Sequence, residues 1–349
     1  MTGNKIINQD IEQIIANRTD WIKFNGKSVL ISGANGFLPA YMVEVLCTLK
    51  IKGCIEEIQI YALVRNIEKA QNRFRHYLEC DFLHFIVQDV CKPIKIDGKV
   101  DYIIHAASQA SPKYYGIDPV GTLNANVLGT SNLLELAKTK QVQSFLYFSS
   151  SEVYGAVDDS KIPTKEHEYG YLDPTKVRSC YAESKRMGEN ICVSFLHQFN
   201  VPVKIVRPFH TYGPGLALDD GRVYADFIAD LVNNNNIVMK SDGSAKRAFC
   251  YLSDATIAFF TILLDGINGE AYNMGNPSCE TSIVDLAQLL LDLFPEKKLK
   301  LIKQDLDNSK YLQSQVSRNC PDISKIKTLG WFPTIGLKEG FYRTLKSYE

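Results

Sequence analysis

A tyrosine and a lysine one helical turn apart are the residues of this chain best suited to chemistry. In Tyr181-Ala-Glu-Ser-Lys185 the i,i+4 spacing predicts that both side chains lie on one face of a helix. A tyrosine acts as a base only after it loses its proton, and its ordinary pKa is about 10. A neighbouring ammonium group favours the phenolate, so we expect Lys185 to lower the pKa of Tyr181. The pair predicts proton transfer at a hydroxyl group.

A run of polar residues after a predicted strand supplies further candidates. Phe148 is followed by three serines and then by Glu152. The hydroxyl of Ser150, just beyond the carboxyl end of the strand, can share a substrate proton with Tyr181. Glu152 can move a proton at a second atom or orient a charged substituent. We therefore expect these two residues to act together with the tyrosine and the lysine.

A turn containing two glycines predicts a dinucleotide site. The apolar strand 28–32 runs directly into Gly33, and Gly36 follows just before a predicted helix. Gly33 allows the tight turn, whereas Gly36 lets backbone N–H groups approach a pyrophosphate at the N-terminus of the helix. Pro39 stands where a third glycine is expected, which is tolerated in a first helical turn.

The residue after the second predicted strand, 58–64, bears on the choice of cofactor. An NAD-selective site places a carboxylate there, on the ribose hydroxyls. This chain has Arg65 instead, which suits a 2′-phosphate or stacks on the adenine. The sequence leaves both NAD and NADP open.

Apolar strands alternate with helical segments through the first two thirds of the chain. Further strands are predicted at 101–105, 144–149 and 203–207, and helices at 40–49, 126–140 and 180–199. This alternation predicts an α/β fold with a parallel sheet and right-handed crossovers. Ligands bind such sheets at the carboxyl ends of the strands.

The distribution of turn-forming residues along the chain suggests three parts. Residues 1–26 are predicted to form an N-terminal helical extension and residues 27–207 the dinucleotide-binding domain. Glycine, proline and asparagine become frequent from Pro208 onward, so 208–349 is expected to be mainly a substrate-binding lobe. Part of 245–265 is expected to return to the first domain.

Composition argues against several classes of function. The 349 residues include 39 basic and 39 acidic side chains, so a net charge of zero gives no reason to expect nucleic acid or a membrane surface as a partner. No apolar run reaches the ~18 residues that a membrane helix needs. The nine cysteines are scattered and form no C-x-x-C pair, which predicts free thiols in a cytoplasmic protein without a metal site.

The order of these motifs from about residue 27 to 272 resembles the extended short-chain dehydrogenase/reductase family, in particular its NAD-dependent epimerases and dehydratases. The resemblance is closest to UDP-glucuronate decarboxylases. It is carried by the segments His105 to Pro112, Ser149 to Gly155, Cys180 to Arg186, Asp220 to Val223 and Arg247 to Asp254. It implies a Rossmann-like doubly wound parallel sheet with a smaller C-terminal α/β substrate-binding lobe.

The resemblance also implies roles for a larger set of residues. The cofactor-binding set is Gly33, Asn35, Gly36, Phe37, Leu38, Arg65, Asp89, Val90, Ala106, Ala107, Ser108, Asn126, Tyr181, Lys185, Pro208 and His210. The substrate-binding set is Ser111, Ser151, Glu152, His210, Arg222 and Arg247. The two arginines of the second set would hold the phosphates of a nucleotide-sugar, with a UDP-sugar as the favoured substrate. The helices 126–140 and 180–199 would pair two subunits into a homodimer.

The implied reaction begins with oxidation of the sugar at C4, and four outcomes stay open after that step. Decarboxylation is favoured because a C4 ketone makes the C6 carboxylate a β-keto acid. Serine at 151, where dehydratases carry aspartate, disfavours 4,6-dehydration, and Glu152 disfavours 4-epimerisation. Arg65 favours an NADPH-dependent 4-keto-sugar reductase.

Two departures from the family pattern weaken the expectation of a carboxylated substrate. His210 stands where the family usually has asparagine, and Gly215 where decarboxylases tend to have arginine. A different class, a non-catalytic protein that senses the cofactor, is disfavoured because such a protein needs no proton-transferring pair.

Overall fold

A computed structural model describes residues 2–18, 20–304 and 316–349 of the chain. Its centre is a seven-stranded sheet in the order β10-β6-β5-β4-β1-β2-β3, in which every neighbouring pair is parallel. In this order the strands are Ala271–Met274, Val203–Pro208, Ser144–Phe148, Tyr102–His105, Lys27–Ser32, Ile58–Val64 and Leu83–Val87. The predicted doubly wound parallel sheet is confirmed.

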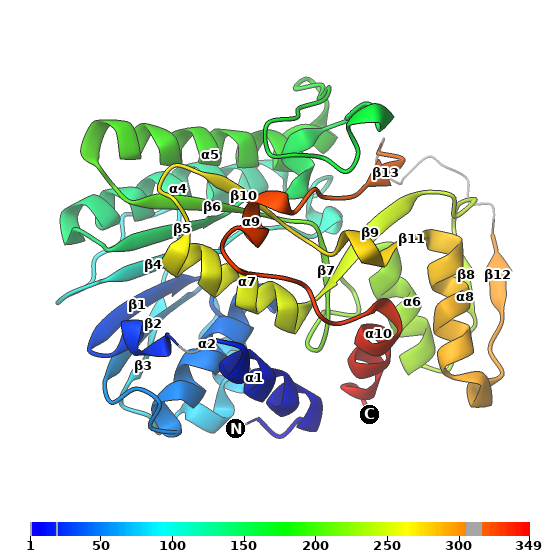
Figure 1. Cartoon of the computed structure of the whole chain (residues 1–349), viewed down its shortest axis with the longest axis horizontal. Coiled ribbons are helices and arrows are strands. Elements are labelled where there is room, and N and C mark those ends of the chain that lie inside the picture. Colours follow the sequence, from blue (N-terminus) through cyan, green and yellow to red (C-terminus); the bar gives the residue numbers. More distant parts are fainter. Residues whose placement is uncertain (1, 19, 305–315) are drawn as a thin grey trace.

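Both faces of the sheet are buried, because helices cover each of them (Figure 1). The side chains of β1 show the alternation: Val29 and Ile31 join one apolar cluster, while Leu30 joins the other. On one face lie α4 (Pro119–Lys140) and α5 (Cys180–Phe199), side by side. The other face carries α1 (Lys5–Asn17), α2 (Phe37–Ile51) and α7 (Leu252–Asp265), and α3 (Ile67–Arg73) precedes the edge strand.

Two helices begin earlier than predicted, and local chemistry explains both. Helix α2 begins at Phe37 and places Pro39 in its first turn, where the missing N–H has no intrahelical partner in any case. Helix α4 begins at Pro119, and the carboxylate of Asp118 accepts a hydrogen bond from Gly121 N at 3.0 Å. An aspartate before a proline is a helix-start signal that the sequence contains.

The second lobe packs around its own apolar core, to the right of the sheet in Figure 1. Its helices are α6 (Val223–Val232), α8 (Ile283–Leu293) and α10 (Leu337–Lys346). Its strands are β7 (His210–Tyr212), β9 (Lys246–Tyr251), β11 (Glu280–Ser282) and β13 (Arg318–Asn319), with a separate pair of β8 (Ile237–Met239) and β12 (Leu301–Lys303).

Two elements beyond residue 207 pack with the main sheet. Helix α7 lies across it, and β10 extends it beside β6. The sequence pattern had placed no strand at β10 or at the opposite edge, β3. The division of the chain into an extension, a dinucleotide-binding domain and a substrate-binding lobe stays a prediction.

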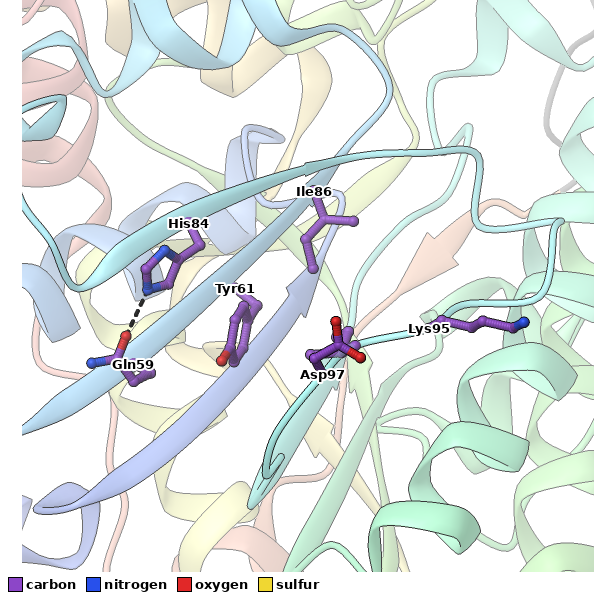
Figure 2. Close-up of a pocket in the computed structure, with 7 residues that line it drawn as sticks. Gln59, Tyr61, His84, Ile86, Lys95 and Asp97 are labelled. Atoms are coloured by element: carbon purple, nitrogen blue, oxygen red, sulfur yellow. Dashed lines mark hydrogen bonds between the residues drawn. The ribbon is translucent and has the colours of Figure 1, made fainter.

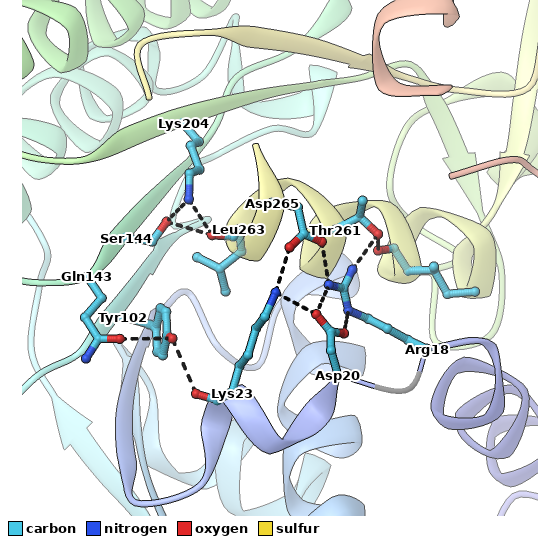
Figure 3. A network of polar contacts seen from close by, with 11 residues as sticks. Arg18, Asp20, Lys23, Tyr102, Gln143, Ser144, Lys204, Thr261, Leu263 and Asp265 are labelled. Carbon is cyan, nitrogen blue, oxygen red and sulfur yellow. Dashed lines mark hydrogen bonds and ion pairs between the residues drawn. The ribbon is translucent and has the colours of Figure 1, made fainter. Parts of the chain in front are cut away.

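A polar network ties the N-terminal segment to the last turn of α7 (Figure 3). Arg18 donates to Thr261 at 2.9 Å and pairs with Asp265 at 2.5 Å, and Lys23 pairs with Asp265 at 2.9 Å. The buried Lys204 donates to the carbonyl of Leu263 at 2.8 Å. These contacts satisfy groups at the C-terminus of a buried helix, which would otherwise lack partners.

Within the described ranges, none of the helices combines the length and the apolar character needed to cross a membrane. All nine cysteines are free thiols.

Candidate active site

The predicted Tyr–Lys pair occupies the first two turns of α5, and the two side chains face each other. Both residues are buried, and the Lys185 ammonium nitrogen lies 5.8 Å from the centre of the Tyr181 ring. Lys185 also donates a 2.6 Å hydrogen bond to the carbonyl of Phe148, the last residue of β5. The start of the helix is thereby joined to the carboxyl edge of the sheet.

The pKa of Tyr181 corrects one expectation. Burial raises it to about 12, and the opposing effects come first from a hydrogen bond with Ser150 and then from the charge of Arg222. Lys185 is not among the main groups that oppose this rise, and burial lowers the pKa of the lysine itself to about 7. The ammonium was expected to make the phenol acidic. In the structure the serine and an arginine of the second lobe have that effect.

Ser150 and Glu152 lie beside the pair, but Glu152 has a partner that the sequence analysis missed. Ser150 accepts a 3.2 Å hydrogen bond from the N–H of Glu152. The carboxylate of Glu152 binds both terminal nitrogens of Arg178, at 3.0 and 3.1 Å. Arg178 lies only three residues before Tyr181, yet nothing in the local pattern shows where its side chain points.

Tyr115 is the second residue that the analysis left out of the site. Its ring stacks on that of Tyr181 with centroids 5.1 Å apart, and the guanidinium of Arg178 lies 4.9 Å from its centre. Its hydroxyl donates to the carbonyl of Ala110 at 2.9 Å, so the ring is held in place. Glu152, Arg178, Tyr115 and Tyr181 therefore form one continuous row of contacts.

The glycine turn has the geometry that a pyrophosphate site requires. Gly33 has a φ of +65°, and a Cβ at this position would meet the Cα of Ala107 at 2.8 Å, so only glycine fits. Gly36 caps α2 without any side-chain hydrogen bond. The N–H groups of Phe37 and Leu38 at the first turn of the helix can therefore bind an anion. Asn35 lies in the same turn.

The segment after β4 and the facing helix α4 contain polar atoms that would suit a ligand. In the part of the chain that the structure describes, the buried Ser108 hydroxyl and the side-chain amide oxygen of Asn126 have no hydrogen-bond partner. Ala106 and Ala107 donate their N–H groups to the Ser32 hydroxyl beneath them. Unpaired buried polar atoms are costly, so they indicate a missing partner. The residues present fit a dinucleotide.

The region predicted to hold the adenine of the cofactor is polar and charged. Arg65 is exposed at the end of β2, and its charge lowers the pKa of both Asp89 and Asp118, in each case as a minor contribution beside hydrogen bonds. The Asp89 carboxylate accepts the N–H of Cys91 at 2.9 Å. Val90 packs against Gly129 of α4, where a Cβ would come within 2.8 Å of it.

The predicted substrate residues of the second lobe face the segment after β4. Ser111 donates to the carbonyl of Asp220, and Arg222 donates to the carbonyl of Ala110 at 2.8 Å. Arg247 extends from β9 and donates to the carbonyl of Val316 at 2.7 Å.

The remaining predicted positions lie at the ends of β5 and β6. Ser151 is buried at the start of the short helix that also holds Glu152. Pro208 is the last residue of β6, and His210 begins β7.

A hollow of about 540 Å³ lies elsewhere, on the edge strands β2 and β3 (Figure 2). Tyr61 and His84 stack there with ring centroids 5.4 Å apart, and His84 bonds Gln59 at 2.6 Å. None of the predicted site residues lines it. The chemistry is concentrated at the carboxyl edge of the central strands instead.

A parallel sheet with a glycine turn after β1 and a buried Ser–Tyr–Lys cluster after β5 defines an enzyme of the extended short-chain dehydrogenase/reductase type. Over residues 29–275 the sequence matches the family described as NAD dependent epimerase/dehydratase. UDP-glucuronic acid decarboxylase 3 of Arabidopsis thaliana is 34% identical over 314 residues, which are 89% of this chain and 86% of that protein. The chain belongs to the NAD-dependent epimerase/dehydratase family.

Solved structures share the fold. An epimerase from Methanothermobacter thermautotrophicus is similar with a TM-score of 0.79 at 22% identity, covering 99% of this chain and 95% of that one. UDP-glucuronic acid 4-epimerase from Bacillus cereus, in complex with UDP-glucuronic acid and NAD, has a TM-score of 0.74 at 21% identity, covering 92% and 98%.

Proposed function

We propose that this enzyme oxidises C4 of the sugar in a nucleotide-sugar with a bound nicotinamide cofactor, and that its reaction is the decarboxylation of UDP-glucuronate. The observation that carries the proposal is the buried cluster of Ser150, Tyr181 and Lys185 beside the glycine turn. The decarboxylase at 34% identity supports the choice of substrate.

Each member of the cluster has a distinct task in the first step. The cofactor, when bound, supplies the chemistry of accepting a hydride from sugar C4 and returning it. Tyr181 takes the proton of the C4 hydroxyl, and Ser150, which is hydrogen-bonded to the phenol, shares that proton. The ammonium group of Lys185 lies near the phenol ring and donates to the carbonyl of Phe148 at the carboxyl edge of the sheet.

Arg178 and Glu152 suit the second step. A ketone at C4 makes the C6 carboxylate a β-keto acid, which loses carbon dioxide. The guanidinium of Arg178 already binds one carboxylate in a two-point contact, so its fork can bind the carboxylate of the substrate. Loss of carbon dioxide leaves an enolate that must gain a proton at C5, and Glu152, released from Arg178, can relay that proton from water.

Gly215, where an arginine was expected for a decarboxylase, has a cation beside it from another element. The guanidinium of Arg73, from α3, lies 2.7 Å from where a Cβ of Gly215 would be. A cation therefore occupies this place from another element. The dehydratase alternative stays disfavoured, because Ser151 supplies no carboxylic acid for the elimination of water.

Product masses test the reaction. We would incubate the purified protein with UDP-glucuronate, and separately with a 4-keto-6-deoxy nucleotide-sugar, each with NAD or NADPH. We expect the first substrate to lose the mass of carbon dioxide, and the Tyr181→Phe variant to leave it unchanged. A gain of two hydrogen atoms by the second substrate, with no reaction of the first, would show that the enzyme is a reductase.

We also propose that the site accepts NADP as well as NAD, with Arg65 near the 2′-phosphate. The exposed guanidinium of Arg65 and the lack of a carboxylate directly after β2 support this. In a fluorescence titration, Arg65→Asp should weaken NADP relative to NAD by about tenfold or more. Arg75→Asp, an exposed charge on the segment after α3, is the matched control. An unchanged ratio of the two affinities in Arg65→Asp would contradict the assignment.

The outer faces of α4 and α5 support a homodimer. They expose Val120, Leu128, Met187, Val193 and Phe199 on adjacent helices, so a second copy packed there would bury one continuous apolar surface. The nine free thiols support a reducing, cytoplasmic location.

A further inference from the structure

His210 is a partly buried imidazole close to two cations. It begins β7, opposite Phe249 of the neighbouring strand β9. Its ring meets those of Phe249 and Tyr224 edge-on, with centroids 5.8 and 6.3 Å away. Within the described residues its Nδ1 atom is buried and has no hydrogen-bond partner. An unpaired polar atom of this kind needs an explanation, since its desolvation is not compensated.

Two arginines and one aspartate carry the charges around His210. Arg247 reaches it from β9, and Arg222 from the segment before α6. Asp220 pairs with Arg222 at 3.0 Å, and Tyr224, from the first turn of α6, meets the imidazole ring edge-on. Helix α10 packs on this strand through Phe341 against Tyr212. Burial, then Arg247, then Arg222 lower the pKa of His210 well below its usual value. The imidazole is therefore neutral in this structure at physiological pH.

We propose that His210 is a third anion-binding group beside Arg222 and Arg247, and that it takes up a proton when the diphosphate of a nucleotide-sugar binds. The inference rests on the proposed function. A diphosphate held by the two arginines would bring negative charge close to the imidazole and offer oxygen atoms to the orphaned nitrogen. Both changes favour the imidazolium, because an adjacent opposite charge and a hydrogen bond to the charged form each raise a pKa.

An asparagine at this position would not behave in this way. An asparagine amide can donate one hydrogen bond to a phosphate, but it cannot change its charge. His210→Asn is therefore a mild substitution that keeps the shape of the site and removes the titration. The affinity of the present chain for a nucleotide-sugar should fall as the pH rises, whereas that of the variant should not.

Calorimetry counts the protons directly. UDP-glucuronate would be titrated into the cofactor-loaded Tyr181→Phe protein, in which turnover is blocked, at pH 7 in Hepes and in Tris. The difference in heat between the buffers gives the protons taken up. We expect a net uptake that approaches one proton per nucleotide-sugar bound, and an affinity that falls several-fold between pH 6 and pH 8. The diphosphate of the probe does not titrate in this range.

Two further variants locate the proton. Adding His210→Asn should abolish both the uptake and the pH dependence, whereas adding His84→Asn, at the distant hollow of Figure 2, should change neither. Binding without proton uptake, or uptake that persists in His210→Asn, would overturn the inference and leave the proposed function standing. Failure of UDP-glucuronate to bind at any pH would overturn both.

Discussion

At the scale of single residues, the proposed base is a phenol that holds its proton more tightly than usual in this structure. Burial raises the pKa of Tyr181 to about 12, and Ser150 and Arg222 oppose this effect. Arg222 belongs to the second lobe, so the acidity of the phenol depends on contacts between the lobes. Tyr115, stacked on the ring, further restricts the position of Tyr181.

Removal of the phenolic hydroxyl should stop turnover without releasing the cofactor. We expect Tyr181→Phe to lower kcat by about 10²–10⁴-fold, the usual contribution of a proton-transferring group, with little change in the Kd of the cofactor. Steady-state rates and a cofactor titration measure the two effects.

Tyr115→Phe is the matched control, since it keeps the stacked ring and loses only the bond to Ala110. It should retain most of the rate. Near-normal turnover by Tyr181→Phe would show that another group is the base.

At the scale of elements, α7 connects the substrate strand β9 to the amino end of the sheet. Its last turn is anchored by Lys204, which donates to Leu263 and Ser144. This lysine is buried with two neutral acceptors and no ion pair among the described residues, and burial lowers its pKa to about 8. The anchor is therefore sensitive to pH.

The stability of the anchor should rise with pH. The ordinary pKa of lysine is about 10.4, so between pH 8 and 10 the unfolded chain binds more protons than the folded one. The contribution of Lys204 to the free energy of unfolding must then increase across this window. The variant Lys204→Met lacks this increase. In urea titrations we expect its free energy of unfolding to fall by ~2 kcal/mol relative to that of the wild type between pH 7.5 and pH 10.

Lys23→Met tests whether the effect is specific. Lys23 belongs to the same network, but its hydrogen bonds to Asp20 and Asp265 raise its pKa above the ordinary value. The stability that Lys23 contributes is fully present below the ordinary pKa of lysine and is lost only at higher pH. The difference in the free energy of unfolding between Lys23→Met and the wild type should therefore stay constant in this window. A constant difference for Lys204→Met as well would contradict the prediction.

At the scale of the whole molecule, the proposed dimer surface lies on the face of the sheet opposite α7. The exposed apolar side chains of α4 and α5 form one surface there because these helices contact each other along their length. Helix α5 also carries Tyr181 and Lys185, so dimer formation would stabilise the helix that positions the proposed catalytic pair.

Light scattering should give about twice the chain mass of 39.3 kDa. Leu128→Asp combined with Met187→Asp should give monomers, because charges would be buried in an apolar interface. Phe332→Asp, an equally exposed apolar residue outside these helices, is the control and should remain dimeric. A wild-type mass near that of one chain would contradict the proposed dimer.

The sequence alone determined the features that depend on neighbours in the chain. Strand and helix periods, the glycine turn and the i,i+4 spacing of Tyr181 and Lys185 are local, and the structure has all of them. The parallel sheet followed from their alternation. Within the described residues the pattern failed mainly at short elements such as β3 and β10, whose few residues carry little periodicity.

Only the tertiary structure decided which distant side chains meet at the site. Arg178 on Glu152, Tyr115 on Tyr181 and Arg73 over Gly215 are contacts between separate segments, so no spacing could reveal them. The pKa of Tyr181 went in the opposite direction to the local argument for the same reason. Burial is a property of the folded chain, and here it outweighs the effects of Ser150 and Arg222, which favour the phenolate.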